Sequence, residues 1–121
     1  MESTYDRIQY YKIGQKQKED IIDKVKAVLS KEKHIKLVWL FGSLTRRESV
    51  RDVDIAIHAE PSFPFKEFLY LNAQLELTLG YPVDMVEIAA VPASLKQRIY
   101  RDGILIKGTK ALQELLEKES V

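Results

Sequence analysis

The residues of this sequence whose types and spacing suggest chemistry are one glycine–serine pair and three aspartates. Gly42 and Ser43 end a β-branched and aromatic run. Asp52 and Asp54 open a second such run, and Asp84 lies within a third. Side chains two residues apart on a strand point to the same face, with their α-carbons roughly 6–7 Å apart. The carboxylates of Asp52 and Asp54 can therefore meet around a divalent ion.

Asp84 belongs to a predicted strand in which Val86 and Ile88 point the same way. If this strand lies beside that of the aspartate pair, at a spacing of about 4.8 Å, three carboxylates converge at one point. Such a cluster repels itself, and either a proton or a metal must relieve the repulsion. Carboxylate oxygens favour Mg²⁺ or Mn²⁺. Two such ions about 3.5–4 Å apart would suit an in-line phosphoryl displacement.

Gly42 and Ser43 lie at a strand end that leads into a predicted helical turn. This position directs backbone N–H groups and a hydroxyl toward an anion such as a nucleoside triphosphate. The polar stretch that follows contains three arginines, Arg46, Arg47 and Arg51, each of which either contacts phosphate or belongs to a solvated loop. Simpler interpretations remain open as well: the serine can be only a helix N-cap, and an aspartate pair alone can cap a turn.

Composition and missing motifs exclude several classes of protein. The 121 residues contain no cysteine, which excludes disulfide frameworks, zinc ribbons, iron–sulfur clusters and thiol nucleophiles. No P-loop or GxGxxG pattern occurs, and His34 and His58 lack metal-ligand spacing. The 19 basic and 18 acidic side chains give a net charge of +1, so no overall attraction to nucleic acid or anionic membrane is expected. The longest apolar run, Leu37 to Phe41, is far below the roughly 20 residues of a membrane span, and we expect a cytoplasmic protein.

Hydrophobic periodicity predicts an α/β fold, with a small mixed sheet and helices packed on one face. The predicted helices cover 15–31, 65–79, 92–102 and 109–118, and the predicted strands cover 35–41, 52–58, 82–88 and 104–106. We expect an N-terminal arm at 1–14 that is either ordered or loose. One domain should follow over 15–108, and 109–121 should be a C-terminal helix of that same domain.

The helix at 65–79 carries more apolar residues than one buried face needs. Its expected core stripe is Phe65, Phe68, Leu69, Leu75 and Leu79. Tyr70, Leu71 and Leu77 widen the apolar surface beyond that stripe, which suggests a surface for a partner or for self-association. In the last helix Leu112, Leu115 and Leu116 are expected to point inward.

The motifs together resemble a known family. The run Leu40-Phe41-Gly42-Ser43, followed after eight residues by Asp52-Val53-Asp54-Ile55-Ala56-Ile57, is similar to the signature of the nucleotidyltransferase superfamily that includes DNA polymerase beta. Val83-Asp84-Met85-Val86 resembles the strand of its third carboxylate, and residues 95–106 resemble the minimal nucleotidyltransferases. The resemblance covers about residues 20 to 108. Many members carry a glycine between the two halves of the signature, and residues 44–51 contain none.

The resemblance implies a polymerase-beta-like fold and a Mg²⁺-dependent transfer of a nucleoside monophosphate, with AMP from ATP the favoured donor, to an acceptor hydroxyl. It implies that Asp52 and Asp54 bind two metal ions, with Mn²⁺ as the alternative to Mg²⁺, and that Asp84 ligates the catalytic one and helps to deprotonate the acceptor. Gly42 and Ser43, with Arg46 and Arg47 nearby, would hold the triphosphate.

The resemblance also implies a partner. Minimal nucleotidyltransferases are often antitoxins paired with a helical HEPN toxin, and some transfer AMP to a tyrosine of that toxin. A chain of 121 residues has no room for a separate acceptor-binding domain, so a HEPN-type partner is expected to supply the hydroxyl. The alternative is a non-catalytic binding module on the same fold that neutralises its partner by contact. Homo-oligomerisation is left open.

Overall fold

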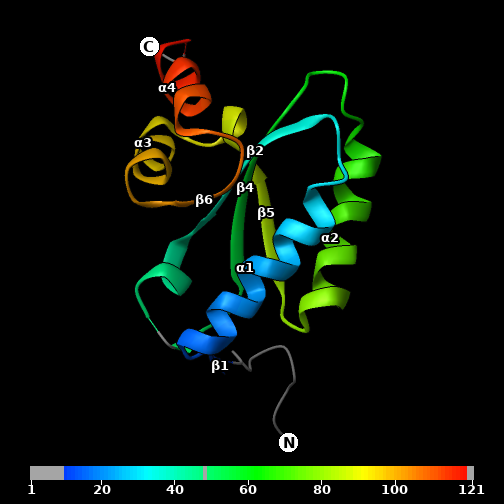
Figure 1. Cartoon of the computed structure of the whole chain (residues 1–121), viewed down its shortest axis with the longest axis vertical. Coiled ribbons are helices and arrows are strands. Elements are labelled where there is room, and N and C mark those ends of the chain that lie inside the picture. The colour runs from blue at the N-terminus through cyan, green and yellow to red at the C-terminus, as the bar shows by residue number, and fades with distance from the viewer. Residues whose placement is uncertain (1–9, 48, 120–121) are drawn as a thin grey trace, which may run out of the picture.

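The computed structural model describes residues 10–47 and 49–119 and shows a central sheet with helices on both sides (Figure 1). In chain order the elements are β1 (Tyr11–Lys12), α1 (Gln15–Leu29), β2 (Ile35–Phe41), a 3₁₀ turn (Gly42–Thr45), β3 (Ser49–Val50), β4 (Val53–Ala59), α2 (Phe65–Leu79), β5 (Val83–Glu87), a second 3₁₀ turn (Ile88–Ala90), α3 (Ala93–Asp102), β6 (Ile104–Lys107) and α4 (Lys110–Glu119). All eight predicted helices and strands are present. The short strands β1 and β3 were not predicted.

The sheet has the strand order β5–β4–β2–β6. The central strand β2 is antiparallel to both β4 and β6, whereas β4 and β5 are parallel, so the sheet is mixed as predicted. The condition placed on the third carboxylate is met, because the strands of Asp54 and Asp84 are neighbours and these two residues pair directly. Phe41, the last residue of β2, pairs with Asp54 from the other side.

Helices α1 and α2 cover one face of the sheet, as predicted (Figure 1). The prediction missed a second layer, because α3 and α4 pack on part of the other face. There Trp39 of β2 is fully buried and meets the ring of Tyr100 edge-on, with centroids 5.7 Å apart. The second layer leaves the start of β5 uncovered, since Asp84 is exposed.

The buried face of α2 differs from the predicted one. Leu75 and Leu79 are buried, but Leu71 joins them, whereas Phe65 is 72% exposed and Leu69 is 53% exposed. A helix turns by about 100° per residue, so Leu69 and Leu71 lie roughly 200° apart and cannot share one face. The row at 71, 75 and 79 packs into the core with the partly buried Phe68 against it, as predicted for Phe68, whereas Phe65 is left at the surface.

The inward face of α4 is also different, because its buried residue is the polar Gln113. The indole N–H of Trp39 donates to Oε1 of Gln113 at 2.8 Å, and Nε2 of Gln113 donates to the carbonyl of Tyr100 at 2.9 Å. A buried indole N–H needs an acceptor, and apolar periodicity alone cannot show that need. Leu116 is half-buried, while Leu115 is 58% exposed.

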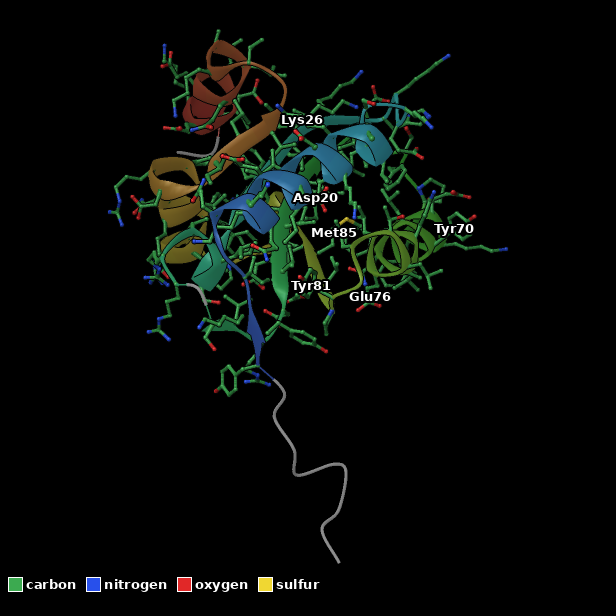
Figure 2. All side chains as sticks on the ribbon, turned by 60° about the horizontal axis from the view of Figure 1, so that its bottom comes forward. Asp20, Lys26, Tyr70, Glu76, Tyr81 and Met85 are labelled. Carbon is green, nitrogen blue, oxygen red and sulfur yellow. The ribbon has the colours of Figure 1, made fainter. Side chains whose placement is uncertain are left out.

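Side chains of α2 cover the free edge of β5. The carbonyl of the Asn72 side chain accepts a hydrogen bond from the backbone N–H of Met85 at 3.1 Å, and the carboxylate of Glu76 accepts one from Val83 at 2.9 Å. Figure 2 labels Glu76 on α2 and Met85 on β5. These bonds satisfy backbone donors that an edge strand would otherwise expose. They also hold the strand that carries Asp84 in place. No helix in the described part of the chain is both long and apolar enough to cross a membrane.

Candidate active site

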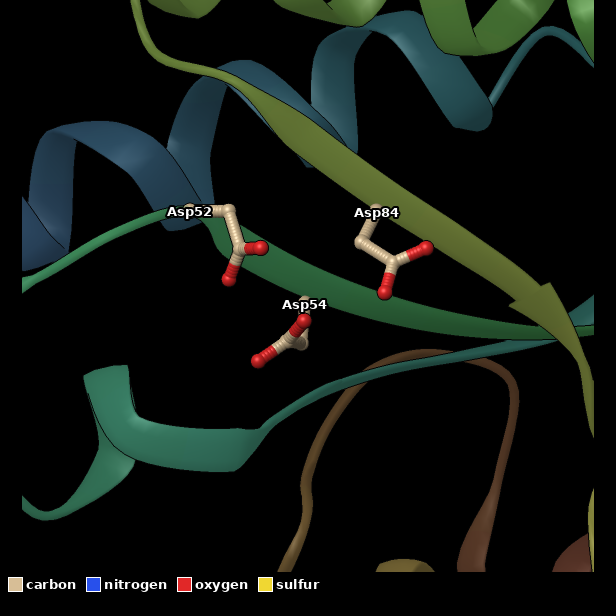
Figure 3. A group of neighbouring side chains, drawn as sticks. All are labelled: Asp52, Asp54 and Asp84. Atoms are coloured by element: carbon tan, nitrogen blue, oxygen red, sulfur yellow. The ribbon is translucent and has the colours of Figure 1, made fainter. Parts of the chain in front are cut away.

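The three aspartates form one cluster at the start of the parallel strands β4 and β5 (Figure 3). Asp54 lies on β4, Asp84 lies opposite it on β5, and Asp52 immediately precedes β4. One carboxylate oxygen of each lies within 4.8 Å of the other two. Asp52 and Asp54 are half-buried and Asp84 is exposed, so the cluster opens to solvent on the side of the edge strand.

The cluster raises the pKa of Asp54 from 3.8 to about 7. Burial is the largest cause, followed by the negative charges of Asp52 and Asp84 and by a hydrogen bond with Asp52. Near neutral pH the metal-free cluster therefore holds a proton for part of the time. The part of this shift that comes from Asp52 and Asp84 is the repulsion that the sequence predicts for three carboxylates at one point, and burial adds the largest single part.

The residues of the cluster fit a divalent cation. Their donor set consists of carboxylate oxygens, which are the ligands that Mg²⁺ and Mn²⁺ prefer. A divalent charge would also offset the repulsion and the burial that raise the pKa of Asp54. The geometry thus satisfies the requirement for a metal site, while the roles of the individual residues stay predictions.

The raised pKa of Asp54 predicts a pH dependence of the metal-free protein. The folded protein holds this proton up to about pH 7, whereas the unfolded chain releases it near 3.8. The stability that Asp54 contributes is therefore fully present below 3.8 and is lost as the pH rises to about 7. We expect the melting temperature of Asp54→Asn, relative to that of the wild type, to rise across this window. Thermal unfolding in EDTA at several pH values measures it, and a difference that is constant with pH would contradict it.

Gly42 brings the backbone of the 3₁₀ turn directly against Asp54. Its φ is +80°, a conformation that residues with a β-carbon rarely adopt. A β-carbon at this position would overlap Oδ2 of Asp54 and lie 2.9 Å from its Cγ. The hydroxyl of Thr45 closes the turn by donating to the carbonyl of Gly42 at 2.7 Å. The proposed phosphate turn and the proposed metal ligand are therefore in contact.

The other residues predicted to bind nucleotide lie on two sides of this turn. Ser43 and Arg47 line a cavity of about 250 Å³ together with Asp52, which places a hydroxyl and a guanidinium beside the cluster. Arg46 instead lines a cavity of about 90 Å³ between the turn and α3, in the company of Arg98. Of the three arginines that the sequence singles out, Arg47 and Arg51 thus line the cavity beside Asp52, whereas Arg46 lies toward α3.

The short strand β1, which was not predicted, packs beside the segments that lead to the site. β1 pairs with β3, the strand that ends two residues before Asp52, and Tyr11 lies opposite Val50. The ring of Tyr11 meets that of Tyr81 edge-on at 5.3 Å, and Tyr81 lies in the turn that leads to β5. β1 therefore contacts the segment before Asp52 and the segment before Asp84. The rest of the predicted arm, residues 1–9, lies outside the described part of the chain.

Comparison with known proteins agrees with the fold. Residues 23–111 match the family of polymerase beta nucleotidyltransferases, and the chain belongs to this family. A Methanocaldococcus jannaschii protein, named as a candidate protein adenylyltransferase, is 37% identical over 71 residues, which are 55% of this chain and 71% of that protein.

Two solved toxin–antitoxin structures contain a chain of the same fold. A tri-AMPylated Shewanella oneidensis HEPN toxin in complex with its MNT antitoxin contains a similar chain, 26% identical with a TM-score of 0.66, and the match covers 80% of this chain and 77% of that one. A toxin–antitoxin structure with AMP-PNP gives 27% identity and a TM-score of 0.67, with 78% of each chain covered. The resemblance to minimal nucleotidyltransferases is therefore confirmed, and the chain is a nucleotidyltransferase.

Proposed function

We propose that this chain transfers AMP from ATP to a hydroxyl of a HEPN-type partner protein and so acts as the antitoxin of a toxin–antitoxin pair. The observation that carries the proposal is the cluster of three carboxylates, within 4.8 Å of one another, packed against the Gly42 turn. The relatives named above support the choice of donor and partner, because one was solved with AMP-PNP and another with an AMPylated HEPN toxin.

Asp52 and Asp54 would hold two Mg²⁺ ions together with the nucleotide, and Asp84 would complete the ligands of the ion nearer the acceptor. When bound, the ions neutralise the charge that develops on the phosphates and lower the pKa of the attacking hydroxyl. The turn at Gly42 and Ser43 would hold the triphosphate. Arg47 lies in the same cavity as Ser43 and would offset the charge of the departing pyrophosphate.

The exposure of the three carboxylates supports an approach of the acceptor from the side of Asp84. Asp84 is exposed on the edge strand, whereas Asp52 and Asp54 are half-buried. The acceptor oxygen would form a bond to the α-phosphorus while the bond between that phosphorus and the pyrophosphate oxygen breaks. Asp84, the carboxylate open to the acceptor, would receive the hydroxyl proton. Asp54 is poorly suited to that role, because it faces the Gly42 turn.

The experiment that tests this function separates catalysis from binding by contact. We expect the chain to neutralise the ribonuclease activity of its HEPN-type partner only when Mg²⁺ and ATP are present, and the partner to stay inactive after the chain is removed. An ATP analogue with a methylene group between the α- and β-phosphates is the control, because it binds but cannot release pyrophosphate. Equal neutralisation without nucleotide would contradict the proposal and favour the non-catalytic binding module.

A further inference from the structure

A further cavity, of about 690 Å³, opens where β4 and β5 end, away from the aspartate cluster at their start. One wall comes from the start of α2 and the loop before it, the facing wall comes from the second 3₁₀ turn and the residue after it, and the floor is formed by the ends of the two strands. We call this cavity the aromatic groove. Its walls are Phe63, Phe65 and Phe68 on one side and Ala89, Ala90 and Val91 on the other.

The wall on α2 is apolar and open to solvent. Phe65 is 72% exposed, and its ring stacks on that of Phe68 with centroids 6.0 Å apart and an angle of 11° between the planes. Leu69 and Tyr70 continue the exposed apolar surface along α2 and are 53% and 67% exposed. Tyr70 lies on the side of the helix that faces away from the sheet (Figure 2). A surface of this kind marks an interaction site, and it extends beyond what a small ligand would cover.

The groove begins two residues along β5 from Asp84, the proposed proton acceptor. Val86 lines the groove and stands on the same face of β5 as Asp84. Two residues of a strand span roughly 6–7 Å, so a bound polypeptide with an anchor side chain in the groove can place a neighbouring hydroxyl at Asp84.

The rim of the groove carries two carboxylates. Glu60 already pairs with Lys36 at 3.2 Å and with Nδ1 of His34 at 2.9 Å. The acidic character of the rim therefore rests on Glu87, with Asp84 farther along β5. Nδ1 of His58, on the floor, is buried 4.0 Å from Oε1 of Glu87 and has no hydrogen-bond partner in the described structure. An apolar side chain with a basic residue near it complements this combination of walls and rim.

We propose that the aromatic groove docks the acceptor. Its occupant is a segment of the partner protein that inserts an aromatic or aliphatic side chain between the two walls, carries a basic residue facing the acidic rim, and presents its hydroxyl at Asp84. This inference rests on the proposed function, and it assigns to the groove the recognition that larger nucleotidyltransferases give to a second domain.

Two variants test the groove without touching the aspartates. Phe65→Ala removes the exposed wall, and Ala90→Trp fills the groove from the facing side without a change of charge. Both positions are exposed, so each variant should fold. Leu77→Ala is the matched control, because Leu77 is 87% exposed on the same helix but roughly 18 Å farther along its axis.

We expect both groove variants to raise the Kd of the purified HEPN-type partner, measured without nucleotide, by about tenfold or more. They should raise the KM for the partner by the same factor as the Kd. The kcat at saturating partner and the affinity for Mg-ATP should stay unchanged. Leu77→Ala should behave as the wild type.

Wild-type partner binding by Phe65→Ala and Ala90→Trp would overturn the inference. So would a sedimentation result in which these variants dissociate a dimer of this chain but bind the partner normally, because the groove would then be a contact between two copies. If the variants weaken partner binding but the wild type transfers no nucleotide, the groove stands as the docking site and the proposed function fails.

Discussion

Asp84→Asn is expected to lower nucleotidyl transfer by a factor on the order of 10²–10⁴ while the variant stays folded and still binds Mg-ATP. The substitution keeps the size of the side chain but removes a negative charge and the carboxylate that we propose as the proton acceptor. Because Asp84 is exposed and helps to raise the pKa of Asp54, its loss should leave the metal-free fold unchanged or slightly more stable. Calorimetric titration of Mg-ATP, a labelled-ATP transfer assay and thermal unfolding in EDTA measure the three quantities.

Asp54→Asn and Asp20→Asn are the comparisons for this variant. Asp54→Asn should impair both metal-dependent nucleotide binding and transfer, because Asp54 lies at the centre of the cluster and against the Gly42 turn. Asp20→Asn alters an exposed carboxylate that pairs with Lys24 on α1, on the opposite face of the sheet, and should change neither. Full transfer by Asp84→Asn would contradict its assignment. Glu87 would be the next acid to test, although its carboxylate already accepts hydrogen bonds from backbone N–H groups.

Gly42→Ala is expected to reduce affinity for Mg-ATP and to lower transfer by on the order of 10²-fold, since small displacements of positioned groups cost that much. The added methyl group would overlap Oδ2 of Asp54, so either the metal ligand or the turn must move. The strain of a β-carbon at this positive φ should lower the free energy of unfolding by roughly 1–2 kcal/mol.

Gly80→Ala separates these two effects. Gly80 ends α2 with a φ of +78°, close to the +80° of Gly42, but a β-carbon there would meet nothing within 4 Å. Gly80→Ala should therefore lose only the backbone contribution on thermal unfolding, Gly42→Ala should lose at least as much, and only Gly42→Ala should lose nucleotide binding and transfer. An unchanged affinity for Mg-ATP in folded Gly42→Ala would remove the turn from the nucleotide site.

The position of the carboxylate cluster was predictable because strand periodicity determines which side chains share a face. Asp52 and Asp54 had only to lie at the start of a strand, and Asp84 on another strand of the same sheet. The direct pairing of Asp54 with Asp84 depends on the order and direction of the strands. That order is a property of the whole fold, so the sequence could state it only as a condition.

The buried faces of α2 and α4 and the strand pair β1–β3 were less predictable. In α2 two apolar rows compete for the core, and the choice of the row containing Leu71 over that containing Leu69 depends on how the helix lies on the sheet. In α4 the inward residue is Gln113, because its side-chain carbonyl accepts the hydrogen bond of the buried Trp39 indole. Hydrophobicity does not predict such a polar residue. β1 and β3 have two residues each, too few for any periodicity.

The most direct test of the central claim is intact-mass spectrometry of the purified HEPN-type partner after incubation with this chain, ATP and Mg²⁺. The account predicts that the partner gains the mass of one or more adenylyl groups. The gain should disappear with EDTA and with Asp54→Asn, and should be strongly reduced with Asp84→Asn. A partner that is neutralised while its mass stays unchanged, or that gains the same mass with Asp54→Asn, would contradict catalysis at the Asp52, Asp54 and Asp84 cluster.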